Sequence, residues 1–479
     1  GDYAASLKDA DEVIQSTQSS DDMRVLYAEA MRLKGLVLFR LGKARESISY
    51  LERALDIFQL NDKTMIPVLL METGMAYRAT GNFSDAGRSY EKALQIWRQT
   101  GNLSWQASLL NNMGGMYHVQ GEYEKAVFAF EEGLLCAQRS RNARLDILIS
   151  IGLGDLFAEL EDFNMAEKNY QYAIEAFRGM DDRFLSHSLT FAQINLALLK
   201  QDGVTARTIL DEVLNVIKAG QSNYEKGFLS LLHGRLYLLE RQPDKAVPDL
   251  KKAEEYFSVD GRDMETAVAH VWHAAAAFQN GDRMEAVRIL KGVYGSFVQI
   301  PHGVLVAVNQ ARTCLDGLQT EADAARVVRD LFTRADRLAN KMPDTRRQLR
   351  RQTRVVQGPA PHLTIQAFGQ AQVSVGGRLL TLSDWQTQSV RDFFFYFLTI
   401  SKPMTKEQIG DVLWNGVYDP AKLKLRFKNE IYRLRKVVGQ EAVLYKDVYY
   451  SFNRKLDYEY DVEAFESHLA RAKAVEHVS

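Results

Sequence analysis

The chain has 479 residues, of which 46% are hydrophobic and 25% are charged. This length exceeds what one compact core usually supports, so we expect several domains or an extended repeat array, and the composition excludes a mostly disordered or fibrous chain. The formal net charge of -1 argues against a surface that binds phosphate over its whole extent.

Neither a membrane span nor a secretion signal is visible in the sequence. The apolar runs are far shorter than the roughly 20 residues that cross a bilayer, and no charged-then-apolar leader opens the chain. The two cysteines, Cys136 and Cys314, have no CxxC partner, so no disulfide framework is expected. We therefore expect a cytoplasmic protein without a membrane partner.

The first 340 residues repeat with a period of 40. Turn-like residues recur at this interval, and each is followed five positions later by an alanine. These turn residues are Gly81, Gly121, Glu161, Gln201, Arg241 and Gly281. Apolar residues four and seven positions after each alanine are typical of one helix face. Before most turns a glycine precedes an aromatic by three positions, as in Gly74 and Tyr77. Each repeat is therefore predicted to be a helical hairpin in which a small residue allows close helix approach.

This arrangement resembles the tetratricopeptide repeat. The resemblance covers residues 1–340 and implies a mainly α fold, an α-solenoid of about eight hairpins that are longer than the usual unit of the family. The segment Gly1–Ile14 fits a second helix without its first, and an array does not begin comfortably on half a hairpin. We therefore expect the natural protein to continue upstream, where regulators that look like this one commonly carry a nucleotide-switch ATPase of the MalT-like STAND class.

Such arrays bind partners along the surface that their first helices form, and the family's positions carry over to this chain residue by residue. The polar members are Arg32, Arg78, Asn111, His118, Asn195 and Arg235, and the apolar members include Phe191 and Phe228. This mixture suits a peptide or protein partner better than a small anion. The alternative is that the apolar members pack on adjacent repeats and the polar members are solvated.

The periodicity ends near Asn340, and residues 341–360 have the composition of a basic linker. The stretch Lys341–Arg354 holds six basic residues and one acidic residue. No helix breaker interrupts residues 348–354, so part of the linker is predicted to extend the last repeat helix, with Pro359 marking its stop.

Residues 361–456 change in character and predict a second domain. The segments LTIQAFG, AQVSV and RLLTL alternate, and Gly376-Gly377 lies where a tight turn needs positive φ. Three short strands are therefore predicted. Helices over residues 387–400, 405–414 and 420–438 follow, and residues 441–452 predict a closing hairpin with its turn at Lys446 and Asp447.

This order of elements predicts a small α+β winged helix-turn-helix domain. The family resemblance rests on Trp385, the pair Leu413 and Trp414, the run Asn429–Gly439 and the segment Asp461–Glu466. These residues look like the OmpR-type DNA-binding domain as it occurs in the Streptomyces antibiotic regulatory proteins (SARP). In that family the last of these segments opens a helical activator domain, so residues 457–479 are interpreted as a helical tail that begins a truncated activator domain.

The physical argument for DNA binding rests on the helix predicted at residues 420–438 and is independent of the family. At about 100° per residue, one stripe of this helix is apolar and is expected to be buried. This stripe consists of Leu423, Phe427, Ile431, Leu434 and Val438. The other side carries the predicted DNA-binding residues Lys422, Arg426, Lys428, Asn429, Arg433 and Lys436, with Tyr432 at the margin.

A helix of this kind fits the major groove of DNA. There arginine can read guanine, asparagine can read adenine, and lysine mostly neutralises phosphate. Lys446 in the closing hairpin is a further predicted contact, to the minor groove or to phosphate, whereas Arg435 on the flank of the helix is expected to pair with an acid. The alternative is that these residues form a solvated basic face.

The sequence shows no site for catalysis. The phosphate loop GxxxxGK[ST], the zinc motif HExxH and the nucleophile elbow GxSxG are absent. His270 and His273 share a helix face, but no acid or cysteine stands at ligand spacing, so packing is favoured over a metal site. We expect no catalytic residue, no metal and no cofactor in this chain.

The sequence therefore predicts a sequence-specific transcription regulator that acts as an activator, in which the repeat array senses a ligand or protein partner and controls the winged-helix reader. The expected partners are double-stranded DNA, RNA polymerase and a peptide or protein ligand, and a homo-oligomer would bring two readers together. The alternative is an interaction scaffold whose winged helix contacts a protein such as RNA polymerase. Salt distinguishes the two, because DNA binding weakens steeply with ionic strength.

Overall fold

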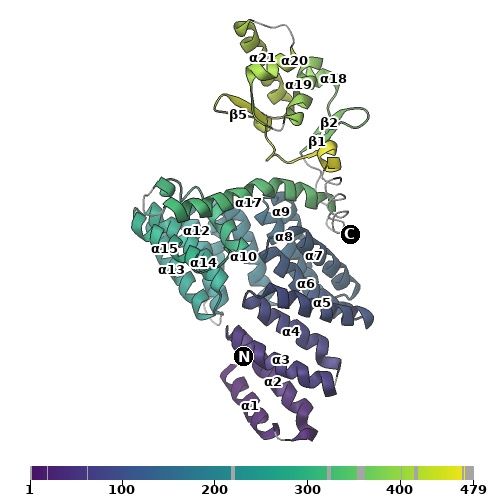
Figure 1. Cartoon of the computed structure of the whole chain (residues 1–479), viewed down its shortest axis with the longest axis vertical. Coiled ribbons are helices and arrows are strands. Elements are labelled where there is room, and N and C mark those ends of the chain that lie inside the picture. The colour runs from purple at the N-terminus through teal and green to yellow at the C-terminus, as the bar shows by residue number, and fades with distance from the viewer. Residues whose placement is uncertain are drawn as a thin grey trace. The chain divides into compact units, whose positions relative to one another are not determined.

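The structure, a computed structural model, describes residues 3–18, 20–61, 63–216, 222–320, 325–352, 362–400, 402–414, 419–466 and 469. The chain is mainly helical, and its strands lie in two sheets in the carboxy-terminal part (Figure 1). It divides into two compact units. The array unit comprises residues 1–342 and 352–357, and the carboxy-terminal unit comprises residues 343–351 and 358–479. The predicted fold class, a helical repeat array followed by a small α+β domain, is confirmed.

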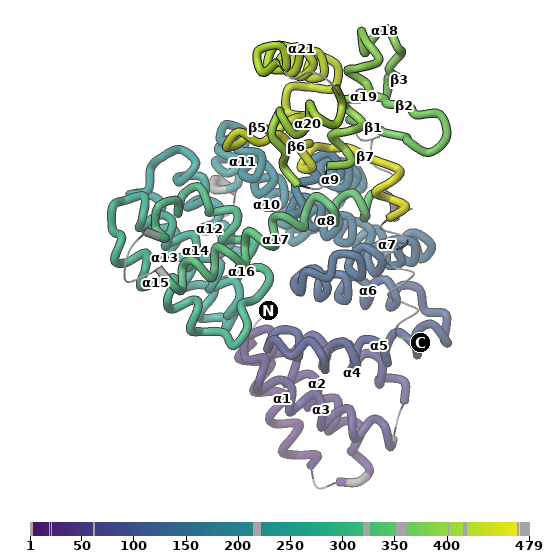
Figure 2. The backbone as a smooth tube through the Cα atoms, turned by 45° about the horizontal axis from the view of Figure 1, so that its top comes forward, coloured from purple at the N-terminus to yellow at the C-terminus, as the bar shows by residue number. Residues whose placement is uncertain are grey.

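Helices α2 to α15 of the array unit pack as consecutive pairs (Figure 2). Helix α1 precedes the pairs, and α16 and α17 follow them. The bounds are α1 Tyr3–Thr17, α2 Arg24–Arg40, α3 Ala44–Asn61, α4 Ile66–Ala79, α5 Phe83–Gln99, α6 Leu103–Val119, α7 Tyr123–Arg139, α8 Ala143–Glu159, α9 Phe163–Phe177, α10 Arg183–Leu199, α11 Gly203–Val216, α12 Asn223–Leu239, α13 Pro243–Val259, α14 Asp263–Gln279, α15 Arg283–Gly295, α16 His302–Gln310 and α17 Ala325–Gln352.

The turns between paired helices lie at the positions that the 40-residue period predicts. Gly81 and Gly121 adopt φ of 77° and 74°, and Glu161 and Arg241 adopt 59° and 58° although they are not glycine. This left-handed conformation ends one helix by supplying backbone N–H groups to its last carbonyls. The next residue then caps the following helix, as where the Asn82 side chain accepts from the Asp85 N–H.

Glycines in the first helices allow the paired helices to touch. A Cβ on Gly74 would lie 2.5 Å from a ring carbon of Tyr90, and a Cβ on Gly154 would lie 2.3 Å from a ring carbon of Tyr170. The aromatic ring that occupies the space therefore comes from the paired helix, not from the aromatic three positions after the glycine. Both rings are almost completely buried, so each pair has a close-packed core.

Two contacts join repeats that are far apart in sequence. A Cβ on Gly42, in the turn between α2 and α3, would lie 2.3 Å from the carbonyl oxygen of Asp260, in the turn between α13 and α14. The ring of His302, at the start of α16, lies against Gly121, and its Nε2 is 2.8 Å from the hydroxyl of Tyr123 on α7. The array is thus closed by contacts that a linear stack of repeats would lack.

The carboxy-terminal unit has two small sheets around three longer helices. One sheet has the strand order β3-β2-β1-β7, with β1 and β7 parallel, and the other has the order β4-β6-β5. The bounds are β1 Leu363–Gln366, β2 Gln372–Val375, β3 Arg378–Leu379, α18 Leu382–Trp385, α19 Gln388–Thr399, β4 Met404–Thr405, α20 Lys406–Leu413, α21 Pro420–Val438, β5 Val443–Lys446, β6 Tyr449–Phe452 and β7 Tyr458–Tyr460. The β2–β3 turn is formed by Gly376 and Gly377, which both have positive φ.

The structure differs from the predicted element limits in two places near the carboxyl end of this unit. Strand β7 pairs with β1 in the register Leu363–Tyr458, so the sheet extends beyond the predicted boundary at Leu456. The hairpin turn lies at Asp447 and Val448, which both have positive φ, one residue later than predicted. Local alternation could not reveal β7, because its partner strand is almost 100 residues earlier in the chain.

The predicted basic linker is helical through Gln352 as part of α17, and residues 353–361 lie outside the described residues. The end of α17 belongs to the carboxy-terminal unit. Arg347 donates to the carbonyl of Arg454 at 2.8 Å, and its guanidinium lies 4.4 Å from the centre of the Tyr458 ring. Arg350 pairs with Asp457. These arginines therefore hold the strand segment before β7, a role that their positive charge alone did not indicate. In the described part of the chain, no helix is both long enough and apolar enough to span a membrane.

Candidate nucleic-acid interface

Helix α21 has well-defined ends. The side chain of Asp419 accepts from the backbone N–H of Ala421 at 2.9 Å, and Pro420 occupies the first helical position. Both features favour a helix start, because an unpaired N–H is satisfied by the carboxylate and proline has no N–H to satisfy. The helix ends at Gly439, which has φ of 107°.

One face of α21 is buried in the core of the carboxy-terminal unit. All five residues of the predicted apolar stripe are buried there: Leu423, Phe427, Ile431, Leu434 and Val438. Helix α20 approaches closely, because a Cβ on Gly410 would lie 2.4 Å from a methyl carbon of Leu423. The rings of Phe427 and Tyr450 are 4.7 Å apart, which joins α21 to β6. The orientation of α21 about its own axis is therefore set by the core.

The opposite face of α21 carries the predicted DNA-binding residues. Lys422, Arg426, Lys428, Asn429 and Lys436 are exposed, whereas Arg433 is half-buried. Lys446, in β5, is also exposed. The ion pairs that the structure describes in this unit use other cations, namely Arg347, Arg350, Arg378, Lys406 and Arg454. Among the described residues, the cations of α21 thus have no carboxylate partner.

Two arginines of α21 have structural contacts. The guanidinium of Arg426 lies 4.6 Å from the centre of the Trp414 ring, which holds it over the end of α20. Arg435 donates to the carbonyl oxygen of Val443 at 2.8 Å. The prediction that Arg435 is structural agrees with this contact, but the expected acidic partner was wrong, because the guanidinium donates to a backbone carbonyl at the start of β5.

Sequence reasoning missed one exposed apolar side chain on the same face, Leu425, which is 63% exposed. Tyr432, which the sequence placed at the margin of this face, is 66% exposed. Lys424 is exposed as well. A search for positively charged residues does not select a leucine. The helical period alone would have indicated that Leu425 lies away from the buried stripe.

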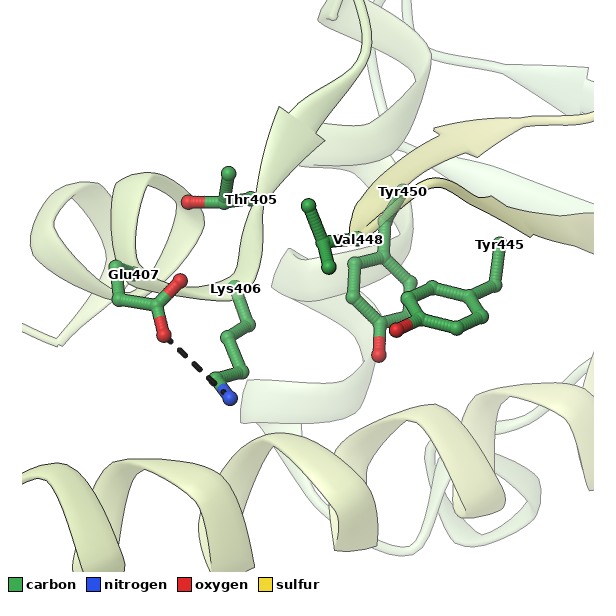
Figure 3. Close-up of a pocket in the computed structure, with 6 residues that line it drawn as sticks. All are labelled: Thr405, Lys406, Glu407, Tyr445, Val448 and Tyr450. Atoms are coloured by element: carbon green, nitrogen blue, oxygen red, sulfur yellow. Dashed lines mark ion pairs between the residues drawn. The ribbon is translucent and has the colours of Figure 1, made fainter.

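The β5–β6 hairpin lies beside α20 and forms a small hollow with it. The hollow has a volume of about 290 Å³ and is lined by Thr405, Lys406, Glu407, Tyr445, Val448 and Tyr450 (Figure 3). The Tyr445 and Tyr450 rings are 4.7 Å apart on one side, and the Lys406–Glu407 ion pair, at 3.4 Å, lies on the other. The positive φ of Val448 is strained, because a β-branched side chain disfavours this conformation.

Most predicted groove residues of the array unit are bound to other residues of the chain. Arg32 pairs with Glu72 at 2.6 Å and also with Glu29. Arg235 donates to Asn195 at 2.7 Å, and its guanidinium lies 4.7 Å from the centre of the Trp272 ring.

The two predicted aromatic members also have internal partners, because the Phe191 and Phe228 rings are 5.7 Å apart. Asn111 is half-buried, and Arg78 is exposed beside Gly115. Phe191 and Phe228 therefore contact each other, whereas Arg32 and Arg235 are matched by other side chains rather than left in solvent.

His118, the remaining predicted groove residue, belongs to a cluster around Glu159. The carboxylate of Glu159 lies 3.4 Å from Nε2 of His118 and 3.1 Å from Nε2 of His302, and it accepts from the hydroxyl of Tyr123 at 2.7 Å. Burial alone would raise the pKa of Glu159, but the two imidazoles outweigh it and lower that pKa. Burial alone would lower the pKa of His118, but Glu159 outweighs it and raises that pKa.

A second half-buried carboxyl, that of Asp155, lies one helical turn before Glu159. Asp155 accepts from the hydroxyl of Tyr170 at 2.6 Å. Burial raises the pKa of Asp155 to about 6, against the lowering effect of this hydrogen bond and of His118. The cluster therefore links α6, α7, α8 and α16 through titratable groups.

No group of three or more potential metal ligands occurs among the described residues. His270 and His273 both contact Glu254, at 3.7 Å and 2.8 Å. Since Nδ1 of His273 has this partner and the ring is buried, these histidines have a structural role.

Comparison with protein-family models identifies the family of the array unit. The model of the MalT-like TPR region family matches residues 28–337, so the chain is a tetratricopeptide-type helical repeat protein and belongs to this family. A crystal structure of a tetratricopeptide repeat protein from Parabacteroides merdae is similar, with 15% sequence identity and a TM-score of 0.39, over 60% of this chain and 98% of that chain. No curated protein matches the sequence.

Proposed function

We propose that the chain is a DNA-binding transcription regulator whose carboxy-terminal unit is a winged helix-turn-helix domain. In this proposal α20 and α21 form the helix-turn-helix, α21 enters the major groove, and the β5–β6 hairpin is the wing. The observation that supports it most directly is the exposed cationic face of α21, whose cations have no carboxylate partner among the described residues. Lysine and arginine left unpaired on a rigid helix suit phosphate oxygens and base edges.

The array unit supplies the regulatory part of this proposal. The MalT-like TPR region is a surface for a ligand or protein partner, and the DNA-binding unit responds to its occupancy. As in the SARP regulators that the sequence resembles, the output is activation through contact with RNA polymerase. Two copies on adjacent half-sites would bind more tightly than one, through effective concentration.

A salt series tests DNA binding. The whole chain is titrated with random-sequence duplex DNA at increasing salt, beside Lys428→Ala and Lys436→Ala. With five or six cations engaged, we expect the affinity to fall by roughly a thousandfold for a fourfold rise in salt, and each variant to reduce the logarithmic slope by about one.

The matched control is Arg378→Ala, which removes an exposed cation on β3 in the other sheet. This control should leave both affinity and slope unchanged. Absence of binding at low salt, or binding that ignores salt and all three variants, would instead favour the protein-scaffold alternative.

A further inference from the structure

Leu425 is a large apolar side chain on the exposed face of α21. An exposed leucine elsewhere on a surface needs no special account. This one is 63% exposed and lies about 160° around the helix from the middle of the buried stripe, at 100° per residue. It therefore points away from the core as directly as Lys436 and Asn429 do.

The surroundings of Leu425 are polar and cationic. Lys422, Lys428 and Asn429 lie within one turn of it on the helix, and all three are exposed. These cations favour a polyanionic partner over an apolar protein surface, because an apolar interface would have to desolvate them. The face thus combines one large apolar side chain with the charge that suits nucleic acid.

We infer that Leu425 reads the 5-methyl group of thymine in the major groove, an inference that rests on the proposed DNA-binding function. Leu425 is the sixth residue of α21, and the amino-terminal part of a recognition helix is the part that reaches base edges. Among the base edges of the major groove, the thymine methyl is the apolar group, and the other edges offer donors and acceptors that leucine cannot use. Asn429, one turn further along, would lie over the neighbouring base pairs, where its amide can bond to adenine.

Deoxyuridine substitution isolates the methyl group, because it removes that methyl and leaves base pairing unchanged. The whole chain is first used to select a tightly bound duplex from a random-sequence library of synthetic DNA. In this DNA, thymine is the base that carries a 5-methyl group. Each thymine of that duplex is then replaced in turn by deoxyuridine. We expect at least one replacement to weaken binding by about fourfold, the value for one buried methyl-sized group.

Variants of the chain assign this effect to a side chain. Leu425→Ala should bind the thymine and deoxyuridine duplexes equally, whereas Leu425→Met should keep the discrimination because its side chain is apolar and of similar length. The salt slope should be the same in all three proteins. Leu379→Ala removes an exposed leucine on β3 and should discriminate as the unaltered chain does.

Three results would overturn the inference. The first is that no deoxyuridine replacement weakens binding. The second is that Leu425→Ala distinguishes the thymine duplex from the deoxyuridine duplex as well as the unaltered chain does. The third is that Leu379→Ala loses this discrimination to the same extent as Leu425→Ala. In each case salt-dependent DNA binding would persist and the proposed function would stand. If the library yields no enriched duplex and binding is absent at low salt, the proposed function itself fails together with the inference.

Discussion

The polar residues predicted in the array unit and those on α21 differ in what surrounds them. The first set is carried over from positions of the tetratricopeptide family, and the second follows from the helical period of α21. In the array unit the side chains are mostly matched to other groups of the chain, as in the pairs Arg32–Glu72 and Arg235–Asn195. On α21, Lys428 and Lys436 have no carboxylate partner among the described residues. The difference teaches that polar residues selected from sequence can either be matched within the fold or left without an internal partner, and that the structure separates the two cases.

This contrast has a physical cause. A repeat helix is packed on several sides, so a polar side chain there is desolvated and must be matched within the fold. Helix α21 is packed on one side by the core of the carboxy-terminal unit, and its other face is exposed to solvent. The variants below test whether the array unit is close-packed and internally matched, and whether the carboxy-terminal unit depends on equally specific contacts.

The largest expected effect is on the close packing of the array unit. Gly154→Val should destabilise it by about 3 kcal/mol, because the new side chain would overlap the Tyr170 ring. Urea denaturation followed by circular dichroism would show an earlier array transition. The matched control is Gly87→Ala, where the nearest atom to a new Cβ would be 3.9 Å away, and here helix propensity predicts a small gain. Equal effects of the two variants would contradict the packing argument.

The next effect concerns the end of α17. Arg347→Ala should destabilise the carboxy-terminal unit by about 2 kcal/mol, because it removes a buried hydrogen bond and a cation–π contact with Tyr458. Hydrogen exchange of the β1 and β7 amides would report the loss. Arg378→Ala, at an exposed ion pair with Asp384, should change the exchange very little. If both variants behave alike, the end of α17 is not part of this unit.

A smaller effect is expected from pH. The raised pKa of His118 means that its contribution to stability is fully present below the ordinary histidine value of 6.5 and is lost as pH rises through the raised value. Asp155 and Glu72 have pKa values raised to about 6 and about 7. The stability that these two carboxyls contribute is also lost as pH rises, but both groups have titrated by about pH 8.

Denaturation midpoints of the array unit should therefore keep falling above pH 7, and His118→Gln should flatten this part of the profile. A profile that keeps its slope in His118→Gln would exclude His118 as the source.

The smallest expected effect is at the tip of the β5–β6 hairpin. Val448→Gly should stabilise the carboxy-terminal unit by about 0.5 kcal/mol, because glycine adopts the φ of 67° without strain and this relief outweighs the extra conformational entropy that glycine gives the unfolded chain. Thermal unfolding measures this, and Val375→Gly, in the extended strand β2, should destabilise instead. A destabilised Val448→Gly would show that the side chain is held by contacts that outweigh the strain.

The sequence predicts the repeating and local parts of the fold well. The 40-residue period places turns at Gly121 and Glu161, where the structure has positive φ, and the paired glycines at 376 and 377 place the β2–β3 turn. The buried stripe of α21 follows from helical geometry. Each of these features is encoded within a few neighbouring residues.

Features that depend on residues far apart in the chain could not be predicted. The pairing of β7 with β1, the docking of Arg347 on Tyr458, and the contact of His302 with Glu159 all need a three-dimensional arrangement. For the candidate interface, the sequence indicates the helix and its cations, but it does not reveal that Arg426 stacks on Trp414 or that Arg433 is half-buried.

The contacts that close the array unit have a consequence for how it unfolds. An array whose repeats touch only their neighbours can fray from its ends, one hairpin at a time. The contact between Tyr123 and His302 spans 179 positions, and Gly42 meets Asp260 across an even longer loop. Such contacts form only after the intervening hairpins have ordered, because the entropy of closing so long a loop must be offset first. Once formed, these contacts couple the unfolding of distant hairpins. We therefore expect the array unit to unfold cooperatively rather than one hairpin at a time.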